Sequence, residues 1–210
     1  FQGTKLLNGN FDYQVTGVNG GVSDFSVRGA KFTGSSQTVS AIVTGSARRG
    51  EMMLVLSGGS LNLSAAGNSF VIEIAGSKGS RELSFSSGQS TASIAAAINA
   101  LTEVTGVSAV VPTGSTSFIR LRSAEFGSDE FVSLKVLNDG GATSSGTAAN
   151  TGIYAVSADG NLGAELGELN AATNGFRKSG QDIQGTINGI IATGKGRTMS
   201  VNTDFLDMEM

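Results

Sequence analysis

Short segments in which apolar and polar residues alternate recur along this chain, and turns rich in Gly, Ser and Asn separate them. This pattern is typical of antiparallel strands that each turn one face toward a core. Phe70–Ile74 and Arg81–Phe85 alternate on either side of Ser77–Ser80, which predicts a hairpin. Met52–Leu56 is apolar throughout and indicates a strand covered on both faces. Further strands are expected at 25–27, 39–43, 107–111, 118–121, 131–137, 183–191 and 199–201.

In one segment the spacing of the apolar residues changes from every second residue to the three- and four-residue spacing of a helix. Ser90 or Thr91 can cap a helix start, and Gly106 is a natural stop, so we expect a helix over about 90–102. Its apolar residues are Ile94, Ala97, Ile98 and Leu101. We expect this stripe to pack on the sheet surface formed by Phe70, Ile72, Ile74, Leu83 and Phe85, with Val107, Val110 and Leu121 nearby.

A second short helix is predicted over about 161–170, where Leu162, Leu166 and Leu169 are suitably spaced. Gly163 and Gly167 weaken that prediction, because Gly lowers helix stability. The fold class is therefore mainly β, of the α+β kind, with antiparallel sheets and two subdomains. The small, polar segment 138–151 is expected to be a loop or a domain boundary.

Composition excludes several functional classes. The chain has no Cys and no His, so it can form no disulfide, no thiolate metal site and no His-dependent catalytic triad. The net charge of -3 does not favour binding to nucleic acid, which proteins contact through basic surfaces. No apolar run approaches the roughly 20 residues that a helix needs to span a bilayer. The sequence begins at Phe1 without Met or a signal peptide, and we expect it to be an excised fragment.

The remaining candidates for chemistry all have a simpler explanation. Gly189–Gly196 nearly matches the phosphate-binding loop, but Gly196 stands where a hydroxyl should bind magnesium, so a hairpin turn is expected. Four carboxylates lack the spacing of a calcium loop, and Asp129-Glu130 is expected to be a turn pair. Those four are Asp182, Asp204, Asp207 and Glu209. No catalytic, cofactor-binding or metal residue is nominated, and no cofactor is expected.

Basic residues occur as scattered pairs, at Arg48-Arg49, Arg120/Arg122 and Arg177-Lys178, which are expected to be solvated. Arg120 and Arg122 should share one face of a strand. Asn62-Leu63-Ser64 is a formal N-glycosylation sequon, and the Ser/Thr-rich loops at 31–38 and 141–151 could carry O-linked sugars.

Three stretches resemble bacterial flagellin. Phe1–Gly9 is similar to the segment that follows the long N-terminal helices of flagellins, and Phe11–Val27 to the hairpin after it. Residues 70–137 resemble the repeat inserted in flagellins and in the filament-cap protein, marked by Ile98-Asn99-Ala100 and Thr105–Ala109. Gly180–Gly196 is similar to the end of such insertions.

The resemblance implies a structural, non-enzymatic piece of the secreted, extracellular flagellar filament, with a role in motility. Its partners would be other flagellin subunits, joined through terminal helices that this sequence lacks, and surface glycans. Neither nucleic-acid binding nor membrane insertion is expected, and the fragment alone should be monomeric. A trunk-proximal subdomain would comprise 1–48 and 152–210, and 49–151 would form an inserted outer subdomain containing the repeat, about 69–137. Leu6–Val15 should then lie beside Met199–Met208.

Two alternatives remain open. A filament-cap or hook-associated protein would share the inserted repeat, although Phe1–Gly9 favours flagellin. A polysaccharide-binding or adhesive module of a cell surface is the rival from another class, although carbohydrate grooves usually expose Trp or Tyr and this chain has no Trp and 2 Tyr. The zinc peptidase insertion of some flagellins needs histidines, which are missing here.

Overall fold

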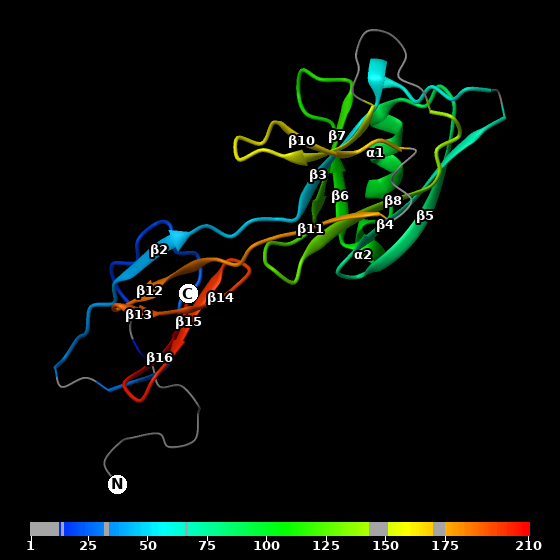
Figure 1. Ribbon diagram of the computed structural model, residues 1–210. Coiled ribbons are helices and arrows are strands. Elements are labelled where there is room, and N and C mark those ends of the chain that lie inside the picture. Colours follow the sequence, from blue (N-terminus) through cyan, green and yellow to red (C-terminus); the bar gives the residue numbers. More distant parts are fainter. Residues whose placement is uncertain (1–12, 14, 32–33, 66, 143–150, 170–174) are drawn as a thin grey trace. The chain divides into compact units, whose positions relative to one another are not determined.

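The structure, a computed structural model, describes residues 13, 15–31, 34–65, 67–142, 151–169 and 175–210. The chain divides into two compact units (Figure 1). The first combines Phe1–Ser46 with Ile183–Met210, and the second is Ala47–Asp182.

Two antiparallel sheets make up the described part of the first unit. One has the order β1-β16-β15-β14 and the other β13-β12-β2. The strands are β1 (Ser26–Ala30), β2 (Ala41–Gly45), β12 (Gln184–Ile187), β13 (Ile190–Ile191), β14 (Thr193–Lys195), β15 (Thr198–Asn202) and β16 (Leu206–Glu209). The strand expected over 183–191 is thus two strands, because Asn188 and Gly189 both adopt positive φ and turn the chain.

The two sheets of this unit share one small core. Its buried members are Ile187, Met199, Val201, Leu206 and Met208, and Phe25 and Val27 pack against them. Burial of alternate residues of β15 and β16 is the expected result of a period-two pattern. The expectation that Leu6–Val15 lies beside Met199–Met208 falls mostly on residues outside those described. Among the described strands, β16 pairs with β1.

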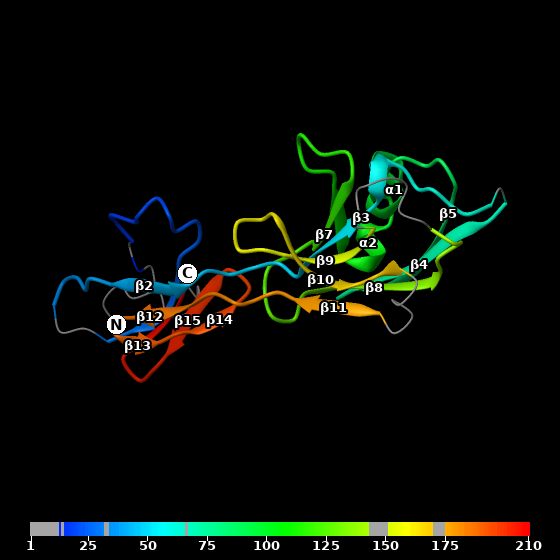
Figure 2. The ribbon, with the colours of Figure 1, turned by 45° about the horizontal axis from the view of Figure 1, so that its top comes forward.

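The described strands of the second unit form two larger antiparallel sheets, ordered β10-β9-β3-β7-β6 and β11-β8-β4-β5 (Figures 1 and 2). Strands of the first are β3 (Glu51–Val55), β6 (Val107–Val110), β7 (Phe118–Ser123), β9 (Gly152–Val156) and β10 (Leu162–Gly167). The second contains β4 (Ser69–Gly76), β5 (Gly79–Ser86), β8 (Phe131–Asn138) and β11 (Phe176–Ser179). A 3-10 turn, η1 (Ser57–Gly59), follows β3.

The inner faces of both sheets and helix α1 (Thr91–Asn99) share a single core. Ile94 and Ile98 of α1 belong to the same buried cluster as Phe70 and Phe85, and α1 contacts β5 of the β4–β5 hairpin. Its neighbours also include β6, where Ala109 is buried and Val110 is 38% exposed. Val107 and Leu121, which we expected near the helix, belong to this buried cluster, whereas the Val110 side chain lies on the other face of β6.

The helix expected over about 90–102 is broken into two, although its start and its stop lie where the sequence signals place them. Ser90 accepts a hydrogen bond from the Ser93 backbone N–H at 3.1 Å and so caps α1. A second short helix, α2 (Thr102–Thr105), ends at Gly106, whose φ of 74° is the left-handed conformation that glycine tolerates best.

Two sequence predictions fail in the second unit. The segment expected to be helical at 161–170 forms strand β10, because Gly163 packs against the Ala155 carbonyl of β9 and the hairpin completes the sheet. We also expected 152–210 to join the chain start, whereas residues 152–182 belong to the second unit. Strand pairing explains this result, since β9 pairs with β3 and β11 pairs with β8.

Candidate functional site: edges and exposed faces of the two units

Side chains of the two helices close one edge of the five-stranded sheet. Asn99 Nδ2 donates to the Ala109 carbonyl at 2.8 Å, and Asn99 Oδ1 accepts from the Ala109 N–H at 2.7 Å. Thr102 Oγ1 donates to the Val107 carbonyl, and Thr105 Oγ1 accepts from the Val107 N–H. The backbone of β6 that would face a further strand is therefore occupied by side chains of the protein itself.

The outer face of the same sheet carries a half-buried ion pair. Arg120 Nη2 lies 3.3 Å from Glu51 Oε2, and both side chains are 23% exposed. Arg120 and Arg122 do share this face, as predicted, while Ile119 and Leu121 are buried on the other. Arg120 is not simply solvated, however, because its Nε is buried and forms no hydrogen bond within the described part of the chain.

Tyr154 lies on this outer face, packed with Met53 and Val55. Burial raises the pKa of its hydroxyl above the usual 10.0, and the negative charges of Glu165 and Glu168 raise it further. The hydroxyl therefore stays neutral at ordinary pH.

The other basic pairs contact aromatic rings. Arg49 lies over the Phe126 ring at 4.3 Å, and its Nη1 donates to the carbonyls of Ser123 and Ala124. Arg177 lies over the Phe131 ring at 3.5 Å. These contacts fix the arginines against the scaffold rather than leave them as freely solvated charges.

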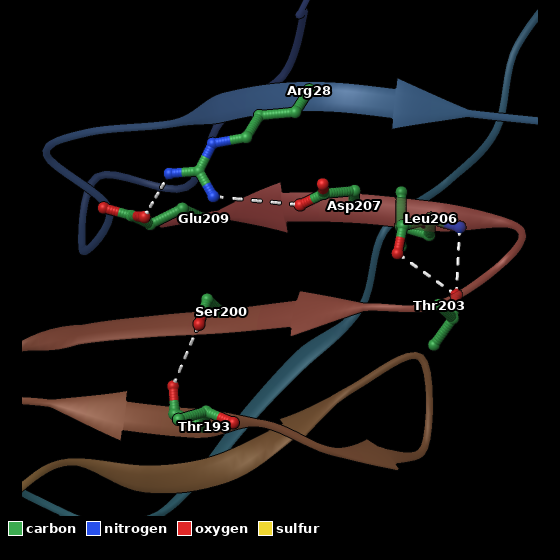
Figure 3. A network of polar contacts seen from close by, with 7 residues as sticks. All are labelled: Arg28, Thr193, Ser200, Thr203, Leu206, Asp207 and Glu209. Atoms are coloured by element: carbon green, nitrogen blue, oxygen red, sulfur yellow. Dashed lines mark hydrogen bonds and ion pairs between the residues drawn. The ribbon is translucent and has the colours of Figure 1, made fainter.

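The four carboxylates considered for calcium do not assemble into one site. Asp182 accepts hydrogen bonds from the backbone N–H and the hydroxyl of Ser128, in the second unit. Asp207 and Glu209, on β16 of the first unit, pair with Arg28 at 3.9 and 2.8 Å (Figure 3). In the residues that the structure describes, no three His, Cys, Asp or Glu side chains lie together as a metal site would require.

Figure 3 also shows the turn that leads into β16. Thr203 Oγ1 donates to the Leu206 carbonyl at 3.1 Å and accepts from the Leu206 N–H at 3.0 Å. The acidic side chains of β16 thus sit on a strand whose start is fixed by local hydrogen bonds.

The segment Gly189–Gly196, which nearly matches a phosphate loop, was expected to be a hairpin turn. It contains strands β13 and β14 and ends at the first residue of a hairpin turn. β14 and β15 pair as a hairpin around Gly196, whose φ is 57°. Since no helix begins there, no helix dipole points toward a phosphate. The Asn62 side chain of the sequon is exposed between buried Leu61 and Leu63. Of the Ser/Thr-rich loops, residues 32–33 and 143–150 lie outside the described residues.

The three-stranded sheet of the first unit exposes apolar side chains. Ile42 and Ile191 are 58% and 84% exposed, and both pair with Thr186, so they lie in one row across a single face. None of the side chains of β2, β12 and β13 is ionisable. Isolated exposed apolar residues are ordinary, and two in one row do not by themselves define a contact surface. The alternation of apolar and polar residues in the sequence could not predict this exposed row, because alternation does not show which face of a sheet is left without a packing partner.

No helix within the described residues is both long enough and apolar enough to cross a membrane.

Comparison with known proteins gives two findings. Residues 69–124 match the family model of the flagellin hook IN motif, which spans β4 to β7 with both helices. A search of curated protein sequences gives no match. The inserted repeat that the sequence suggested at about 69–137 is thereby confirmed as a flagellin-type motif over residues 69–124.

The fold resembles that of flagellar cap proteins. The D2-D3 domains of FliD from Serratia marcescens superpose with a TM-score of 0.52 at 17% identity, covering 89% of this chain and 89% of that chain. FliD (HAP2) from Pseudomonas aeruginosa PAO1 gives a TM-score of 0.54 at 17% identity, covering 88% of this chain and 76% of that one. What these structures share with this chain is the fold.

Proposed function

We propose that this chain is the outward-facing, non-enzymatic part of an extracellular flagellar axial protein. The observation that carries the proposal is the flagellin hook IN motif at residues 69–124. The fold likeness to cap-protein domains over most of the chain supports the same class. The role is geometric: two β-rich units present a surface outside the filament.

Within this class, flagellin is the proposal that the chain ends support. Phe1–Gly9 resembles the flagellin segment that follows its N-terminal helices, and Gly180–Gly196 resembles the end of an inserted region. The unit built from Phe1–Ser46 and Ile183–Met210 would then be trunk-proximal, and Ala47–Asp182 would be the outer insertion. Terminal helices beyond this chain would join it to neighbouring subunits.

A cap or hook-associated protein is the second candidate. It is favoured by a specific observation, the similarity of fold to the FliD domains from two organisms. Both candidates are secreted structural proteins of one assembly, so their location along the filament separates them.

Immunogold electron microscopy tests the proposal. Antibody raised against this chain is applied to flagella of the organism that produces it. Gold along the whole filament supports flagellin, and gold confined to the tip or to the hook junction supports the second candidate. Gold on the cell body and none on flagella would contradict both and would favour an adhesive surface module.

A further inference from the structure

Strand β5 is an open edge of the second unit. It pairs with β4 on one side, and no strand of the described residues lies beyond it on the other (Figures 1 and 2). The two-residue turn at Ser77–Lys78 makes Gly76 and Gly79 a hydrogen-bonded pair of β4 and β5. Because such pairs alternate with non-hydrogen-bonded pairs along an antiparallel ladder, every second residue of β5 directs its N–H and carbonyl away from β4. Those residues are Ser80, Glu82, Ser84 and Ser86, and all four are exposed.

Most of these outward backbone groups are unoccupied in the described structure. The Ser80 carbonyl accepts from the Arg81 guanidinium, and the Ser86 carbonyl accepts from the Gln89 N–H. Among the described residues, no hydrogen-bond partner is found for the outward N–H or carbonyl of Glu82 or Ser84. The contrast with β6 is direct, because there Asn99 fills the equivalent groups of Ala109.

The side chains beside this edge leave a negative charge uncompensated. Glu82 lies directly opposite Glu73 of β4, and Glu73 lies opposite Lys135 of β8. The row across the sheet therefore contains one cation, Lys135, followed by two carboxylates, Glu73 and Glu82. Like charges directly opposite each other destabilise a sheet, and an opposite charge beyond Glu82 would complete an alternating row.

We infer that β5 receives an extended segment of a partner protein that carries Lys or Arg opposite Glu82. The segment adds an antiparallel strand and hydrogen-bonds to the backbone of Glu82 and Ser84. A second copy of β5 fits less well, because its outer face carries only Ser and Glu while Arg81 points to the other face. This inference does not depend on which flagellar protein the chain belongs to.

Binding of two short probe peptides to the full chain tests the inference. The probes are acetyl-Val-Thr-Val-Lys-Val-Thr-amide and the same peptide with Glu in place of Lys. Amide hydrogen exchange and NMR chemical shifts are followed at Ser80, Glu82, Ser84 and Ser86. The Lys peptide should protect the amides of Glu82 and Ser84 and should bind about fivefold more tightly than the Glu peptide.

Two variants separate the backbone contribution from the charge. Ser84→Pro removes an N–H that β4 does not use, and it should abolish binding, whereas Ser84→Ala keeps the N–H and should bind normally. Glu82→Lys should reverse the preference, so that the Glu peptide binds more tightly. Because Glu82 is exposed, the last variant tests the inference even if Ser84→Pro fails to fold.

Three results would overturn the inference. The first is no protection of β5 amides by the Lys peptide at millimolar concentration. The second is equal affinity for the two peptides in the wild-type chain. The third is protection of these amides that grows with protein concentration without peptide, which would identify a second copy as the occupant.

Discussion

The side-chain amide of Asn99 and the backbone of Ala109 form a reciprocal pair of hydrogen bonds, at 2.8 and 2.7 Å. An Asn side chain offers a donor and an acceptor with the same separation as a peptide group, so it can replace a neighbouring strand for one residue. This contact gives a physical reason for two stretches of the motif, Ile98-Asn99-Ala100 and Thr105–Ala109. The first supplies the helix residue and the second supplies the strand that it closes.

Replacing Asn99 should destabilise the second unit. Asn99→Ala leaves the N–H and carbonyl of Ala109, which is 3% exposed, without these partners and should lower the free energy of unfolding by about 1–2 kcal/mol. Asn62→Ala is the control, because Asn62 is exposed, and it should change stability by less than about 0.5 kcal/mol. Urea unfolding measures both. Equal midpoints would show that water replaces the Asn99 amide at no cost.

The core of α1 gives a second prediction. Ile98 is 1% exposed, so Ile98→Ala should cost roughly 2–4 kcal/mol through lost apolar transfer energy and the cavity left behind. Ser93→Ala, on the exposed face of the same helix, should be nearly neutral. Thermal unfolding compares them, and equal melting temperatures would contradict the packing of α1 on the β4–β5 hairpin.

Gly76 should tolerate no side chain. A Cβ there would meet the Thr105 carbonyl and lie 2.9 Å from Val107 Cγ2, so Gly76→Ala should destabilise by about 1–3 kcal/mol. Gly29, also in a strand, has nothing within 4 Å of the added atom, and Gly29→Ala should be neutral or slightly stabilising. Calorimetry distinguishes the two outcomes, and a Gly76→Ala variant as stable as wild type would refute the close approach of α2 to β4.

Tyr154 predicts a stability change at high pH. Because the folded state raises the pKa of its hydroxyl above 10.0, the unfolded chain releases this proton first as pH rises. The contribution of neutral Tyr154 is complete below about pH 10 and is lost as pH rises through the folded pKa. Tyr154→Phe should therefore lose less stability than wild type between pH 9 and pH 11. Parallel stability curves for the two proteins would contradict the raised pKa.

Local patterns predicted the elements of the second unit well. Alternation located β4, β5, β7 and β8, and the change of period together with Ser90 and Gly106 located the helices. These signals depend on residues close in sequence, so they do not require knowledge of tertiary contacts.

Predictions failed where distant segments decide the structure. Leu162, Leu166 and Leu169 have helical spacing, but β9 was available as a pairing partner and Gly163 permitted its close approach. The assignment of 152–182 to the chain ends failed for the same reason, since only strand pairing shows which unit a segment completes. Neither the exposed row of Ile42 and Ile191 nor the open edge of β5 could be predicted, because both depend on which neighbours are absent.

Electron cryomicroscopy of flagellar filaments sheared from the producing organism tests whether this chain lies on the filament surface. Two β-rich densities, matching the units Phe1–Ser46 with Ile183–Met210 and Ala47–Asp182, should repeat on that surface at every subunit of the helical lattice. A map whose repeating subunit has no such density, from filaments that also lack peptides of this chain, would contradict the assignment to the filament.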